Sequence, residues 1–164
     1  MELDQVYLEH VNDLYRYLYS LSKDHFIAED LVQEAFYRAY LHLEDYEISN
    51  IRAWLFKVAY HAFIDFQRKN KRLVIQAEMD ESNSSRDTPE KKLLEKESFQ
   101  LLLEEIHLLK EQERHVLLLC DLHQLAYNEV AEILGMNLNT LKSHLHRGRR
   151  KVMEKVKERK KTDE

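Results

Sequence analysis

Apolar side chains recur every three or four residues along most of this chain, which is the period of an α-helix with one buried face. The first such stripe consists of Tyr7, Val11, Leu14, Leu18 and Leu21. A second, wider stripe consists of Ala28, Leu31, Val32, Ala35, Phe36, Ala39, Tyr40 and Leu43. A third consists of Trp54, Leu55, Val58, Ala59, Ala62, Phe63 and Phe66. Three such helices can enclose a small core, so residues 1–72 are predicted to form one helical domain.

The helical period disappears between Gln76 and Thr88, where residues 80–87 are all small or polar. This composition is typical of a flexible linker, which we place at residues 73–88. Thr88 and Pro89 then predict a helix start, because threonine can cap free amides and proline is tolerated at the first helical position. Residues 89–164 are therefore predicted to form a second domain.

The second domain is predicted to end in two helices joined by a short turn. Its first stripe consists of Leu93, Leu94, Leu102, Ile106 and Leu109, and another helix begins near Val116. Residues 127–134 and 138–157 form the last pair, separated by Gly135, Met136 and Asn137, which is the helix-turn-helix arrangement. Two glycines and one proline leave little material for β-turns. The predicted fold class is all-α, with two small helical domains on a flexible linker.

The composition, 44% hydrophobic and 34% charged, is that of a soluble helical protein. No apolar run approaches the roughly 20 residues needed to cross a bilayer. Acidic Glu2 and Asp4 stand where a secretory signal would carry basic residues, so we expect a cytoplasmic protein. The single cysteine, Cys120, excludes an intrachain disulfide and agrees with a reducing compartment.

The net charge of −5 conceals a strong separation of charge along the chain. Residues 1–50 hold eleven acidic side chains against three basic ones, whereas residues 142–161 hold ten basic side chains against two acidic ones. An acidic segment commonly meets a basic protein surface, and a basic segment commonly meets phosphate. Two different macromolecular partners are therefore predicted.

The second helix of a helix-turn-helix enters the DNA major groove, where its first residues reach base edges. Asn137 is the expected cap of this helix, and Leu141 and Leu145 are expected to pack on Ala131 and Leu134. The outer face would then carry Lys142, Ser143, His146 and Arg147, followed by Arg149, Arg150 and Lys151 along the DNA backbone. Arginine can donate two hydrogen bonds to guanine. The alternative is that these cations only complement the dipole of the helix.

Other chemistry has little support in the sequence. Cys120 and His123 share a helix face, but no further ligands follow at the spacing of a zinc site. His144 and His146 are two residues apart and would point in different directions. Because neither a nucleophile motif nor a phosphate-binding glycine loop is present, we expect no catalytic site, no metal and no cofactor.

Several segments together resemble the extracytoplasmic-function group of sigma factors, which keeps only the second and fourth conserved regions of the sigma-70 family. Residues 28–36 (AEDLVQEAF), 52–59 (RAWLFKVA) and 63–65 (FID) are similar to the second region. Residues 112–119 (QERHVLLL), 127–135 (YNEVAEILG) and 140–147 (TLKSHLHR) are similar to the fourth. The resemblance covers nearly the whole chain apart from the linker.

The resemblance implies a binding role for each region. Asp30 and Glu34 lie four residues apart, where like charges disfavour an isolated helix, and with Gln33 they would bind the β' clamp helices of core RNA polymerase. The −10 promoter element would meet Tyr46, Ser49, Asn50, Lys57, His61, Arg68 and Lys69. The −35 element would meet Lys142, Ser143, His146, Arg147, Arg149 and Arg150. The fourth region would also bind the polymerase β flap, and an anti-sigma factor would occlude both domains. No small-molecule substrate is implied.

The sequence departs from the family pattern at four positions. Lys110 stands where proline is usual, and Ala126 replaces the serine or threonine that caps the next helix, a loss of about 1 kcal/mol. Tyr60 and His61 replace the common arginine and asparagine of the −10 helix. Trp54 and Phe63 are interpreted as core residues.

Two functions other than that of a sigma factor stay open. One is a conventional helix-turn-helix regulator, whose first domain would dimerise or bind a ligand, and the other is an enzyme fused to a DNA-binding module.

Overall fold

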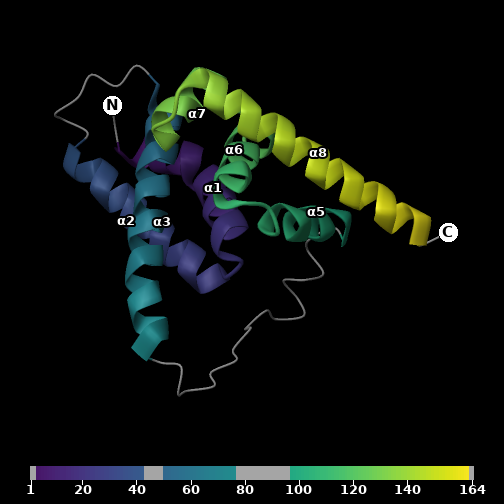
Figure 1. The fold of residues 1–164 in the computed structure, drawn as a ribbon. Helices are drawn as coiled ribbons and strands as arrows, with labels where there is room; N and C mark the ends of the chain where they lie inside the picture. Colours follow the sequence, from purple (N-terminus) through teal and green to yellow (C-terminus); the bar gives the residue numbers. More distant parts are fainter. Residues whose placement is uncertain (1–2, 43–49, 77–96, 163–164) are drawn as a thin grey trace. The chain divides into compact units, whose positions relative to one another are not determined.

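The computed structural model describes residues 3–42, 50–76 and 97–162, and within these ranges every regular element is a helix. The chain divides into two compact units, Met1–Asp87 and Thr88–Glu164 (Figure 1). The predicted all-α fold class is confirmed. None of the described helices combines the length and the apolarity needed to cross a membrane.

The first unit is built from α1 (Leu3–Ser22), α2 (His25–His42) and α3 (Ile51–Gln76), each of which packs on the other two. Tyr17 is fully buried and its ring lies 5.1 Å from that of Phe56 on α3. The apolar residues that complete this core are Val6, Leu14, Leu18, Leu21, Ala28, Leu31, Val32, Ala35, Phe36, Ala39, Leu55, Ala59, Ala62 and Phe63.

Short polar side chains set where α2 and α3 begin. The Asp24 carboxylate accepts hydrogen bonds from the backbone amides of Phe26 (2.8 Å) and Ile27 (3.1 Å), which is an N-cap. The side-chain oxygen of Asn50 accepts the amide of Ala53 in the same way, at 3.1 Å. Asn50 therefore has a structural role in addition to the DNA contact predicted for it.

The buried face of α3 differs from the predicted one. Its core positions are Leu55, Phe56, Ala59, Ala62 and Phe63. Their spacing places them on one face of the helix. The placement of Phe63 is confirmed, but the prediction that Trp54, Val58 and Phe66 are buried is wrong, because all three are only partly covered. Apolar residues occupy so much of this helix that their period alone does not select one face. Tyr7 and Tyr40, also predicted to be buried, are exposed.

The helix α3 continues to Gln76, four residues into the segment predicted as linker. No glycine or proline lies between Arg72 and Gln76 to end a helix there. The rest of the predicted linker and the helix start at Thr88 and Pro89 lie outside the described residues, so these domain limits stay predictions.

The second unit contains α5 (Glu97–His107), α6 (Glu111–Leu117), a π-helical turn (Leu118–Leu122), α7 (Tyr127–Leu134) and the long α8 (Leu138–Thr162). α8 packs on α5, α6 and α7 (Figure 1). The side chains that pack in this core are Leu103, Ile106, Leu109, Val116, Leu117, Leu118, Leu119, Leu125, Val130, Ala131, Ile133, Leu141, Leu145 and Val152.

The helix-turn-helix is present as predicted. Gly135 ends α7 in the left-handed region (φ 65°), which glycine adopts without steric cost. The side-chain oxygen of Asn137 accepts the amide of Thr140 at 2.8 Å and so caps α8. Leu141 and Leu145 are buried, which turns the intervening polar residues outward.

Lys110 and Ala126, which differ from the family pattern, do not prevent α6 and α7 from beginning directly after them. Lys110 adopts φ −60°, which is also the value that proline would impose, so α6 still begins at Glu111. Ala126 makes no side-chain cap, as expected from its methyl group. The carboxylate of Glu129 instead accepts the Ala126 amide at 3.0 Å, which is half of a capping box.

Candidate nucleic-acid interface

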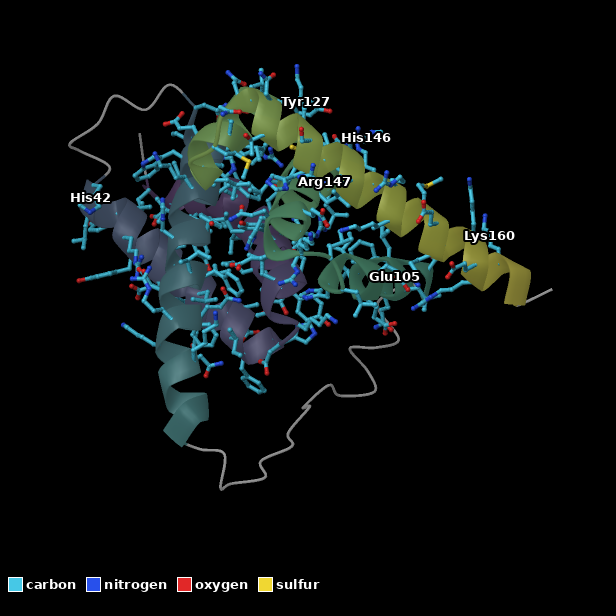
Figure 2. All side chains as sticks on the ribbon, viewed as in Figure 1. His42, Glu105, Tyr127, His146, Arg147 and Lys160 are labelled. Atoms are coloured by element: carbon cyan, nitrogen blue, oxygen red, sulfur yellow. The ribbon has the colours of Figure 1, made fainter. Side chains whose placement is uncertain are left out.

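The outer face of α8 carries the side chains predicted for −35 recognition. Lys142, Ser143, His146 and Arg147 are all exposed. The opposite side of the helix is buried, at Leu141, Leu145, Gly148 and Val152. Figure 2 shows His146 and Arg147 as neighbours on α8. The packing of the helix therefore leaves these four polar residues available to a partner.

Arg147 is held at two points by protein groups. Its Nε lies 3.6 Å from Oε2 of Glu113 on α6, and its Nη2 lies 3.1 Å from Nδ1 of His144. Glu113 also accepts two hydrogen bonds from Nζ of Lys151, at 2.8 and 3.1 Å. Sequence reasoning missed Glu113, because its partners are 34 and 38 residues further along the chain.

Glu113 is ionised despite its burial. Desolvation would raise the pKa of this carboxyl, but the hydrogen bond and the positive charge of Lys151 outweigh it and lower the pKa. A hydrogen bond from the backbone of Lys110 acts in the same direction. The second unit therefore contains a buried negative charge directly beneath its most basic helix.

Gly148 lets α8 approach α6 closely. A Cβ atom at this position would lie 2.5 Å from Cδ1 of Leu117 and 3.5 Å from Cβ of Glu113. The absence of a side chain therefore brings the neighbouring residues Arg147 and Lys151 within reach of the Glu113 carboxylate. The sequence signal was an isolated glycine inside an otherwise continuous helical pattern.

Arg149 is tied to the segment that precedes α7. Its guanidinium donates to both carboxylate oxygens of Asp121, at 2.9 and 2.6 Å, and to the Tyr127 hydroxyl at 3.4 Å. The hydrogen bond to Asp121 raises the pKa of Arg149. Arg150 is exposed. Both arginines, predicted to meet DNA, are exposed, but Arg149 also joins two parts of the unit through its ion pair with Asp121.

The distal part of α8 is fixed to α5. Arg159 Nη2 lies 2.6 Å from Oε1 of Glu105, a residue that is only 4% exposed. Figure 2 shows Glu105 on α5 and Lys160 near the far end of α8. α8 therefore extends beyond the helix-turn-helix as a supported helix.

The acidic face of α2 lies where the sequence predicted it. Asp30, Gln33 and Glu34 are exposed. Arg38 lies 2.9 Å from Glu34 and 2.9 Å from Asp65 of α3, so it links the two helices. Burial would lower the pKa of Arg38, but the hydrogen bonds to the two carboxylates raise it.

Large apolar side chains extend this acidic face along α2. Phe26 is 57% exposed and Tyr37 is 61% exposed, and each is four residues from Asp30 or Gln33. Tyr40 and Leu41 are also exposed, in the last turn. Sequence reasoning did not include these residues in the interface. Tyr40 was assigned to the core by its helical period, whereas Phe26, Tyr37 and Leu41 lie off the predicted apolar stripe and were assigned no role.

Four of the residues predicted for the −10 element, Lys57, His61, Arg68 and Lys69, lie on α3. His61 is exposed, with its ring 5.5 Å from that of Tyr60, and Arg68 and Lys69 are exposed further along the helix. Lys57 is partly buried. Tyr46 and Ser49, predicted for the same element, lie outside the described residues.

Within the described ranges, no group of three or more His, Cys, Asp or Glu side chains is arranged to hold a metal ion. Cys120 and His123 are both buried. Burial and the Asp121 charge raise the pKa of the Cys120 thiol to about 11.

Comparison with known families identifies both units. Residues 6–73 match the model of sigma-70 region 2, and residues 99–152 match that of sigma-70 region 4. The joint match favours a sigma factor over a conventional regulator, which the helix-turn-helix alone allowed.

Individual relatives agree with this result. The chain is 35% identical to the ECF RNA polymerase sigma factor SigM of Bacillus subtilis over 93% of both chains. It is 31% identical to the RNA polymerase sigma factor YlaC of the same organism, over 90% of this chain and 87% of that one. Among solved structures it resembles the sigma factor RpoE in complex with the anti-sigma factor NepR from Bartonella quintana (TM-score 0.80, 28% identity, 94% of this chain and 96% of that one). The chain therefore belongs to the extracytoplasmic-function sigma factors, the subunits that direct RNA polymerase to promoters and initiate transcription.

Proposed function

We propose that the two units divide promoter recognition between them. The first binds core polymerase through α2 and the −10 element through α3, and the second reads the −35 element through α8. The observation that carries this division is the position of the two charged surfaces. An acidic face lies on α2 in the first unit, and a basic helix-turn-helix face lies on α8 in the second.

At the −35 element, we assign base reading to Arg147 and phosphate contact to Lys142 and Arg150. Arginine presents parallel N–H donors that fit guanine O6 and N7, whereas lysine acts as a point charge. Ser143 and His146 lie on the same exposed face and would contact neighbouring bases. Arg149, already bonded to Asp121, would contribute by fixing α8 and would reach DNA only if that ion pair opened.

At the polymerase, Asp30, Gln33 and Glu34 would bind the β' clamp helices through charge-assisted hydrogen bonds. Phe26 and Tyr37 would add apolar contact beside them. The second unit would bind the β flap. Aromatic side chains are enriched in the packed centre of protein interfaces, and charged side chains commonly lie around that centre, at the rim.

At the −10 element, His61, Arg68 and Lys69 of α3 would follow the melted strand, with Lys57 nearer the core. Asn50 would remain the cap of α3 while its exposed amide faced DNA. Tyr46 and Ser49 would hold a flipped base of this element, because bases flipped out of the stack are commonly held by aromatic rings and short polar side chains.

An anti-sigma factor is the proposed regulator, because the solved relative RpoE forms a complex with NepR. It would occlude the surfaces that bind polymerase and DNA.

We further propose that the protein works as a binding subunit without catalysis of its own, in the cytoplasm where polymerase acts.

Run-off transcription tests this division of labour. Purified core polymerase is mixed with the full chain and genomic fragments, and start sites are mapped. Arg147→Ala should weaken −35 recognition without loss of polymerase binding, whereas Asp30→Ala with Glu34→Ala should do the reverse. If both variants lost polymerase binding to the same extent, the division of roles between α2 and α8 would be contradicted.

A further inference from the structure

A buried carboxylate lies beneath the proposed DNA-reading face of α8. Glu113 is 1% exposed and stands in the first turn of α6, on a helix that makes no proposed contact with DNA. A buried ionised carboxylate requires paired charges. Lys110 contributes one beside α6, and the ion pairs come from Arg147 and Lys151 of the DNA-binding helix itself.

The two cations differ in how tightly Glu113 holds them. Lys151 donates to both carboxylate oxygens, at 2.8 and 3.1 Å, so each oxygen accepts one hydrogen bond from it. Arg147 Nε, at 3.6 Å, forms an ion pair that is too long for a good hydrogen bond. Lys151 therefore stabilises the buried charge, and that charge in turn attracts the neighbouring guanidinium.

The position of Arg147 is defined by two contacts on different atoms. Nε faces Glu113, and Nη2 donates to Nδ1 of His144 one turn earlier on α8. A long flexible side chain fixed in this way loses less rotamer freedom when it binds. Functional groups need such support from neighbouring side chains to keep their geometry.

We propose that Glu113 is a positioning residue for −35 recognition, which orients Arg147 so that the chain discriminates between base pairs without itself touching DNA. This inference rests on the proposed function, because it requires that Arg147 reads the −35 element. It adds a residue from α6 to the determinants of specificity.

Glu113→Gln tests the inference because it preserves the shape of the side chain and removes its charge. Without the ion pair, Arg147 would sample several orientations, and discrimination at the −35 element would fall. The affinity of the variant for DNA phosphates would not fall, because the substitution removes a negative charge beneath the basic helix α8. A purely structural role would instead weaken all DNA binding together.

The experiment uses full-length variants reconstituted with core polymerase. Run-off transcription is measured on a mapped promoter and on the same promoter with its −35 element replaced. Discrimination is the transcript yield from the intact promoter divided by the yield from the altered one. The ratio is expected to fall about tenfold in Arg147→Ala and about fivefold in Glu113→Gln. Glu154→Gln, an exposed position on α8, is the matched control and should keep the wild-type ratio.

A double variant separates positioning from an independent effect. Glu113→Gln should cause no further loss of discrimination in the Arg147→Ala background, because the side chain that it orients is already absent. Additive losses would overturn the inference, as would a Glu113→Gln ratio within twofold of wild type.

Glu113→Asp covers the case in which Glu113→Gln fails to fold. Its shorter carboxylate keeps the charge and Lys151 can follow it, but the longer contact to Arg147 would be lost, so the same decrease in discrimination is expected. A wild-type ratio in a folded Glu113→Asp protein would contradict the inference. The proposed function itself fails if Arg147→Ala leaves the ratio unchanged, which is a separate outcome.

Discussion

His115 lies inside the second unit, although its ring can carry a charge near neutral pH. It is 1% exposed, and burial together with the positive charges of Arg114 and His107 lowers its pKa from 6.5 to about 4. The folded protein therefore binds this proton less readily than the unfolded chain does. Its contribution to stability is complete above about pH 6.5 and is lost as the pH falls toward 4.

We expect the free energy of unfolding to drop by roughly 2 kcal/mol between pH 7 and pH 5 because of this residue alone. Urea denaturation at the two pH values measures the drop. His115→Gln should show a smaller pH dependence, whereas His42→Gln, at an exposed histidine of α2, should behave as wild type. An unchanged pH dependence in His115→Gln would show that the ring is not the titrating group.

Cys120 is predicted to be unreactive in the native protein. The thiolate is the reactive form, and burial with the Asp121 charge raises the pKa of this thiol to about 11. A thiol-specific disulfide reagent should label the native chain at least about 100-fold more slowly than the chain unfolded in guanidinium chloride. Equal rates would mean that the π-helical turn exposes the sulfur.

At the scale of elements, the contact between α6 and α8 depends on the missing side chain at Gly148. Gly148→Ala should be nearly neutral, because a gain of about 1 kcal/mol in helix propensity opposes the displacement of Leu117. Gly148→Val should destabilise the protein by about 1–3 kcal/mol, because two further methyl groups add bulk where a Cβ alone would already lie 3.5 Å from Glu113 and 3.6 Å from Leu109. Thermal unfolding of the two variants gives the comparison, and equal stabilities would refute a close approach.

The start of α6 also shows how one residue serves two elements. Arg114 donates to the backbone oxygens of His107 (3.0 Å) and Leu109 (3.1 Å), which satisfies one carbonyl at the end of α5 and one in the connection that follows it. The angle between α5 and α6 is therefore supported by a side chain as well as by the core.

At the scale of the whole molecule, the tether between the units is expected to contribute to activity. Each unit presents a modest surface, and linking two modules raises the effective concentration of the second to the millimolar range. The segments 1–87 and 88–164, added separately to core polymerase, should fail to direct initiation at a concentration where the intact chain succeeds. Full activity from the separate segments would show that each binds tightly by itself.

Much of the fold was predictable because local signals agreed with the tertiary structure. Leu14, Leu18, Leu141 and Leu145 are buried as their spacing predicts, and Asn137 caps α8. α3 was less predictable, since both Trp54 and Phe56 could occupy its core face and only Phe56 does. The residues on the outer face of α8 followed from the same spacing, once the buried leucines were known.

The amino-acid sequence by itself determined the helical class, the helix-turn-helix, the separation of acidic and basic charge and the family resemblance. These properties depend on residue type and short spacings, which one segment contains completely. The tertiary structure decided which charges meet: Glu113 with Arg147 and Lys151, Asp121 with Arg149, and Glu105 with Arg159. These pairs are 28 to 54 residues apart in the chain, and only the packing of α8 on its neighbours brings them within a few ångströms.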